Sequence, residues 1–173
     1  PKAESIATVR NFMVLGNLND GTARPNRLNW SGYNNTESWA ASIATQSDTR
    51  DLEGDGGDIQ AIVPGQYGVI FQENSIWTMQ YSGPPTIFRL NEVEEGRGTP
   101  APDSVCWSGS TIYYLGQDGF YAFNGQGSRP IGAEKVDRWF FSTASENSVR
   151  FVRGVVDRRN RMVIWSFRSD STL

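Results

Sequence analysis

An acidic, glycine-rich segment holds the residues whose types and spacing come closest to those of a metal site. Residues 51–58 (DLEGDGGD) place carboxylates at alternate positions ahead of a glycine turn. Calcium takes several oxygen ligands, which one tight bend can supply. The EF-hand pattern fails, because its twelfth position falls on Ile62 instead of a glutamate. The segment is therefore either a calcium loop of another kind or, as we expect, a solvated loop; the candidate ligands are Asp51, Glu53, Asp55 and Asp58.

The sequence contains no histidine, which removes the commonest catalytic designs. A Ser-His-Asp triad, a Cys-His pair and a histidine zinc site each need an imidazole. Paired carboxylates, as glycosidases use them, need none. Most acids here, however, fall in expected turns or in one exposed-looking run, where solvated roles are expected: Asp20, Asp118 and Asp157 in turns, and Glu92, Glu94 and Glu95 in the run. We predict a protein that is not an enzyme and needs no cofactor.

The single cysteine and the aromatic residues have structural roles as their simplest interpretation. Cys106 lies between Val105 and Trp107, which predicts a buried strand position and a thiol with no imidazole to activate it. A second group of side chains could form a platform on which a sugar stacks, although packing in a core is the favoured interpretation. These candidates are Trp30, Tyr33, Trp39 and Trp77.

The charge balance limits the partners. Sixteen Lys and Arg against nineteen Asp and Glu give a formal net charge of −3. Such a chain lacks the overall basic field that nucleic-acid binding requires, so we expect no direct sequence-specific nucleic-acid partner. No apolar run approaches the roughly 20 residues of a membrane span, so we expect no membrane contact.

Turn residues divide the chain into groups of short apolar runs. The clearest group extends from Ile59 to Leu90, where turns at Gly65, Glu73-Asn74 and 83–85 separate four runs, as in an antiparallel meander. A similar group begins about 46 residues later, near Val105. A period in the forties with several strands per repeat indicates β-propeller blades. We predict an all-β fold of antiparallel meanders that forms a partial or complete propeller of three to four visible blades. It would be a single region, 1–173, with blades at about 9–48, 59–95, 104–141 and 149–173.

Three further segments have local predictions. Asn11–Leu15 and Asn26–Ser31 flank a turn rich in Asn, Asp and Gly, which predicts a hairpin. Residues 45–58 are polar and acidic, which predicts a surface loop. Ala133–Phe141 spaces its apolar residues by three and four, which predicts a short helix with one apolar face. That face would hold Val136, Trp139 and Phe140.

Several of these runs together resemble a known family. A similar sequence pattern occurs twice: residues 29–31 (NWS) are followed by 37–39 (ESW), and residues 67–71 (YGVIF) are followed by 75–79 (SIWTM). Residues 98–105 (GTPAPDSV) and 114–125 (YLGQDGFYAFNG) continue it. Over roughly residues 10–168 this pattern resembles that of tailed-bacteriophage tail proteins of the short-tail hub, nozzle or DNA-stabilisation type.

The resemblance implies a structural component of a bacteriophage virion, in the tail or the head-to-tail connection. It implies contacts with other tail, connector or portal proteins, a homo-oligomeric ring that is commonly sixfold, and synthesis in the host cytoplasm before assembly into the virion. It supplies no catalytic residues. From the two ends, at Pro1 and Leu173, we expect a piece of a larger protein. The alternative is a carbohydrate-binding or glycoside-processing β-propeller built on the aromatic platform.

Overall fold

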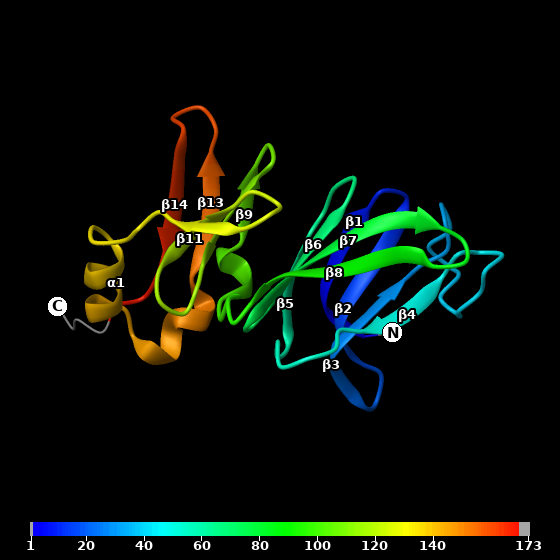
Figure 1. The fold of residues 1–173 in the computed structure, drawn as a ribbon. Helices are drawn as coiled ribbons and strands as arrows, with labels where there is room; N and C mark the ends of the chain where they lie inside the picture. Colours follow the sequence, from blue (N-terminus) through cyan, green and yellow to red (C-terminus); the bar gives the residue numbers. More distant parts are fainter. Residues whose placement is uncertain (1, 170–173) are drawn as a thin grey trace. The chain divides into compact units, whose positions relative to one another are not determined.

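The computed structural model describes residues 2–169 and is mostly β-structure. Strands make up 52% of it and helices 9%, which confirms the all-β prediction. The chain divides into two compact units, Pro1–Gly98 and Thr99–Leu173. Each unit is built of antiparallel sheets, drawn in Figure 1.

The first sheet of the N-terminal unit is a four-stranded meander whose strands follow chain order. The predicted hairpin is confirmed, because its two strands pair in an antiparallel manner. The strands are β1 (Ala3–Val9), β2 (Phe12–Asn19), β3 (Ala23–Trp30) and β4 (Asp48–Asp51).

Two features of this sheet differ from the predictions. Strand β1 lies almost entirely ahead of residue 9, where the first repeat was expected to start. Strand β4 falls inside the segment predicted to be a loop. Its sequence, DTRD, has no apolar residue and hence no period-two pattern. It is held instead by backbone pairing with β3 and by the Arg27–Asp51 ion pair, whose Nε–Oδ1 distance is 2.5 Å.

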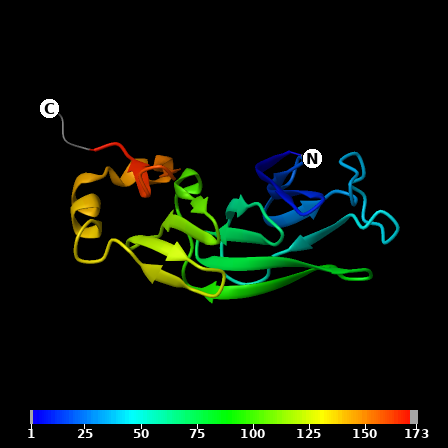
Figure 2. The ribbon, with the colours of Figure 1, turned by 90° about the horizontal axis from the view of Figure 1, so that it is seen from above.

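The second sheet is another four-stranded meander in chain order, and it agrees with the clearest sequence prediction. Its last two strands are the longest, nine residues each, and form the extended pair visible in Figures 1 and 2. The strands are β5 (Ile59–Val63), β6 (Gly68–Gln72), β7 (Ser75–Gly83) and β8 (Ile87–Glu95).

The two sheets of this unit pack through their first strands and enclose one core. Strand β1 contacts β5, and Val9 forms a parallel bridge with Gly65. The approach is close, because a Cβ added at Gly68 would lie 2.9 Å from Val9 Cγ2. The largest fully buried side chains of this core are Phe12, Leu28, Trp30, Leu52, Ile59, Ile70 and Met79.

The C-terminal unit repeats the pattern with a third four-stranded meander and then adds a hairpin. The first strands of these two sheets, β9 and β13, are again in contact. The elements are η1 (Pro102–Ser104), β9 (Cys106–Ser108), β10 (Thr111–Leu115), β11 (Phe120–Phe123), β12 (Ser128–Pro130), α1 (Asp137–Thr143), η2 (Glu146–Phe151), β13 (Arg153–Asp157) and β14 (Met162–Ser166).

The predicted helix exists but begins later than expected. Backbone N–H groups of Lys135 and Val136 donate to the Gly132 carbonyl, so a turn occupies the first predicted residues and α1 spans only Asp137–Thr143. On so short a helix only Phe140 is buried; Trp139 is 57% exposed and Val136 46%. The predicted shared face is present, because all three residues line one apolar cavity, although only Phe140 is buried.

Over residues 2–169 the structure contains neither a closed sheet nor a closed propeller. No helix in this part of the chain has the length and apolar composition that crossing a membrane would require.

Candidate binding site

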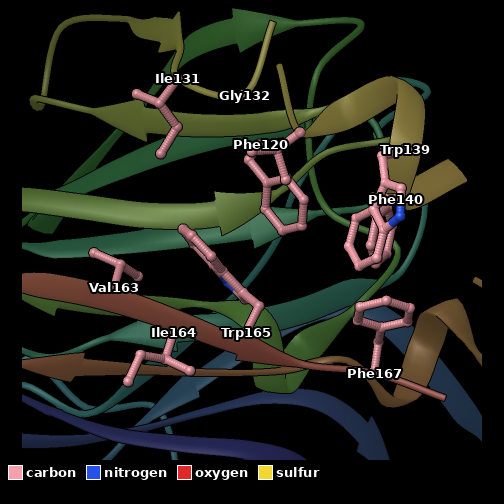
Figure 3. Close-up of a pocket in the computed structure, with 10 residues that line it drawn as sticks. Phe120, Ile131, Gly132, Trp139, Phe140, Val163, Ile164, Trp165 and Phe167 are labelled. Carbon is pink, nitrogen blue, oxygen red and sulfur yellow. The ribbon is translucent and has the colours of Figure 1, made fainter.

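The C-terminal unit contains an apolar cavity of about 340 Å³. Its walls come from β11, α1, β14 and the segments that follow β12 and β14, as Figure 3 shows. The lining residues are Phe120, Ile131, Gly132, Val136, Trp139, Phe140, Val163, Ile164, Trp165 and Phe167.

Five of the ten lining residues are aromatic, and their rings pack against one another. The ring centroids of Phe120 and Trp165 are 4.6 Å apart, and those of Phe120 and Phe140 are 5.0 Å apart. Phe140 also meets Phe167 edge to face at 4.9 Å. Such contacts add about 0.5–1.5 kcal/mol per pair beyond burial, so the wall is preorganised by its own rings.

Two polar contacts fix the rings in place. The Trp165 indole Nε1–H donates to the Ser104 carbonyl oxygen at 3.0 Å. Gly154, opposite Trp165 in the β13–β14 register, leaves the space that this ring needs, because an added Cβ would lie 2.8 Å from Nε1. At the other wall, the Asp137 carboxylate accepts the Phe120 backbone N–H at 3.1 Å, which joins α1 to β11.

The cavity offers apolar contact and no acid–base chemistry. None of its ten lining residues has a titratable side chain, a hydroxyl or a thiol. A site of this kind binds an apolar side chain or a small apolar molecule, because binding removes both surfaces from water.

The four candidate calcium ligands have different surroundings in the structure. Both Asp51 carboxylate oxygens accept hydrogen bonds from the Arg27 guanidinium, which holds the pKa of Asp51 below its usual range. Glu53 and Asp55 are exposed in the loop, and half-buried Asp58 immediately precedes β5. Within residues 2–169, no group of three or more Asp, Glu, Cys or His side chains is arranged to hold a metal ion. The calcium hypothesis therefore gains no support from the geometry.

The acid predicted in the last turn does form that turn. The Asp157 carboxylate accepts backbone N–H groups of Arg159 and Asn160, each at 3.0 Å, and the Asn160 side-chain amide at 2.7 Å. The hydrogen bonds from Asn160 lower the pKa of Asp157. Asp157 thus stabilises the hairpin turn, because its carboxylate accepts hydrogen bonds from the turn's own N–H groups.

The aromatic residues considered for a sugar platform do not share one exposed surface. Trp30 is fully buried, and its indole donates to the Gln46 carbonyl. Trp77 and Trp39 are half-buried, with indole N–H groups bonded to Ser75 Oγ and the Thr36 carbonyl. Tyr33 is 46% exposed. Packing in a core is therefore the correct interpretation for Trp30.

Cys106 is buried, as predicted, and its thiol should be unreactive at neutral pH. Burial raises the pKa of Cys106 to about 11. At pH 8 roughly one thiol in a thousand would be thiolate, against about a quarter of an exposed cysteine. We expect alkylation of the folded protein at pH 8 to be at least about 100-fold slower than in denaturant. Equal rates in the two conditions would show that the thiol is accessible.

Sequence reasoning missed the cavity. Its rings come from positions far apart in the chain, so no local pattern brings them together. The alternate aromatic positions in β14 and beyond were the available clue, since residues two apart share one face of a strand.

Comparison with known proteins found no match to this chain among family models or curated sequences.

Proposed function

We propose that the chain is a structural component of a tailed-bacteriophage virion, in the tail or the head-to-tail connection, and acts through protein–protein contacts. Its sheets would be successive blades of a β-propeller. It would meet other tail, connector or portal proteins as part of a homo-oligomeric ring.

The observation that carries this proposal is the repeated sheet. Three meanders each have four strands in chain order, and a hairpin follows them. Within each unit the first strand of one sheet contacts the first strand of the next: β1 with β5, and β9 with β13. Propeller blades surround their axis with one equivalent strand from each blade, so this arrangement supports the blade interpretation.

The cavity favours a binding role over a chemical one. Its apolar, ring-lined wall suits an anchoring side chain of a partner protein, because buried aromatic pockets commonly hold such anchors. The absence of titratable groups from its ten lining residues leaves no residue there to transfer a proton.

The experiment is to purify particles made by the genome that encodes the chain and to measure their protein composition by mass spectrometry. We expect the chain in every particle at a fixed copy number, and particles without complete tails when its gene is deleted. Finished particles that lack the chain, or normal tails after the deletion, would contradict the proposal.

A further inference from the structure

The β13–β14 hairpin has an outer face that is apolar and exposed. Val155 and Ile164 lie opposite each other in its register, and Met162 shares the face of Ile164 two residues away. Their exposed fractions are 58%, 46% and 48%. The opposite face contributes Val163 and Trp165 to the cavity, whose edge Ile164 also reaches, so the hairpin is packed on one side and largely open on the other.

The turn of the same hairpin concentrates positive charge. Arg158, Arg159 and Arg161 are all exposed, and we call them the arginine tip. Among the described residues, no ion pair engages any of the three. Asp157, the acid beside them, is already bonded to the turn's own amides. Figure 1 shows this turn pointing away from α1.

The N-terminal unit carries a surface of opposite charge. Antiparallel pairing brings the start of β5, the β6–β7 turn and the end of β8 to one end of their sheet. The loop before β5 joins them, because Gln72 Nε2 donates to the Gly57 carbonyl and Asn74 N to the Gly56 carbonyl. We call this surface the acidic end; its acids are Asp55, Asp58, Glu73, Glu92, Glu94 and Glu95.

Negative charges at the acidic end are crowded. Partial burial and the charge of Glu95 raise the pKa of Glu92. The nearby cation Arg97 lies 3.8 Å from Glu94. A cationic partner would relieve this repulsion between carboxylates.

The composition of the hairpin favours a protein partner over a nucleic acid. Met and Arg are enriched in protein interfaces and Lys is depleted, and β13, β14 and their turn contain Met162 and several Arg but no Lys. Exposed apolar side chains beside the arginines would gain nothing from a phosphate backbone, whereas a protein surface would bury them.

We propose that the β13–β14 hairpin docks on the acidic end of a second copy of this chain. The arginine tip would pair with the carboxylates, and the apolar face would be buried beside them. Because the two surfaces differ, the contact is heterologous, and repetition closes a ring or extends a filament. The inference deepens the proposed function, on which it rests, by naming the contact between neighbouring subunits.

The test exchanges the charges of the two surfaces. One variant is Arg158→Glu/Arg159→Glu/Arg161→Glu, and the other is Glu92→Lys/Glu95→Lys. We expect the unaltered chain to self-associate at about 0.05 M salt and to dissociate at about 0.5 M. Each variant alone should associate at least about tenfold more weakly, and an equimolar mixture should assemble again, because each altered surface then meets a complementary one. Native mass spectrometry and light scattering report the oligomeric state.

The control is Arg24→Glu/Arg129→Glu/Arg138→Glu, which reverses three exposed arginines elsewhere and should associate like the unaltered chain. Circular dichroism checks that every variant is folded. A monomeric unaltered chain at low salt, variants that assemble normally, or a mixture that stays dissociated would each overturn the inference. A chain found in virions that does not self-associate would contradict this inference and leave the proposed function standing.

Discussion

Replacing Phe140 with alanine should lower the free energy of unfolding of the C-terminal unit by about 3–5 kcal/mol. Phe140 is 1% exposed and packs against Phe120 and Phe167. Removing the ring loses its burial and leaves a void that the other rings fill incompletely. Urea unfolding gives the free energy, and hydrogen exchange in β10, β11 and α1 locates the loss.

The matched control for this change is Phe151→Ala. Phe151 is 64% exposed, so its truncation should cost no more than about 0.5 kcal/mol. Helix α1 is held to β11 by the Phe140 ring and by Asp137, whose carboxylate accepts the Phe120 N–H. Loss of the Phe140 ring should loosen this attachment, so the Phe120 amide should exchange faster. Similar costs for the two phenylalanines would mean that α1 does not cover the core.

Local pattern predicted the second sheet well and other elements less well. β5, β6, β7 and the first half of β8 are largely apolar and are separated by turns of Gly, Asn and Pro, so both signals agree. The acidic second half of β8 extends to Glu95, past the expected end at Leu90. β4 could not be predicted, because its four polar residues are held by β3 across the sheet and carry no pattern of their own. The start of α1 was misplaced, because the competing turn at Gly132 depends on carbonyl geometry that composition does not reveal.

The cavity and the two charged surfaces could not be predicted from local sequence patterns. Phe120, Phe140 and Trp165 are distant in the chain and meet only because α1 and β14 both pack against β11. The acidic end illustrates the same limit. For residues 51–58 the expectation was a solvated loop, with a calcium loop as the alternative. Antiparallel pairing places part of that loop beside Glu73 and the end of β8, which spreads the carboxylates over a surface. Carboxylates spread in this way are better suited to pairing with a basic protein surface than to chelating a single metal ion.

Replacing Ile76 with alanine should destabilise the N-terminal unit by about 2–5 kcal/mol. Ile76 is fully buried in β7 and lies opposite Phe71, which is buried too. The matched control is Ile6→Ala in β1, whose side chain is 62% exposed; it should cost no more than about 0.5 kcal/mol. Urea unfolding of the two variants and the unaltered chain measures the difference.

This comparison also tests the register of the second sheet. The pairing of β7 with β8 shifts between Ile76 and Trp77, which lie opposite Glu94 and Glu92. A slip of one residue would move Ile76 to the other face of the sheet and would displace the carboxylates of the acidic end. A cost below about 0.5 kcal/mol for Ile76→Ala would therefore contradict the strand placement. A cost in the expected range supports the register that gathers these acids at one end of the sheet.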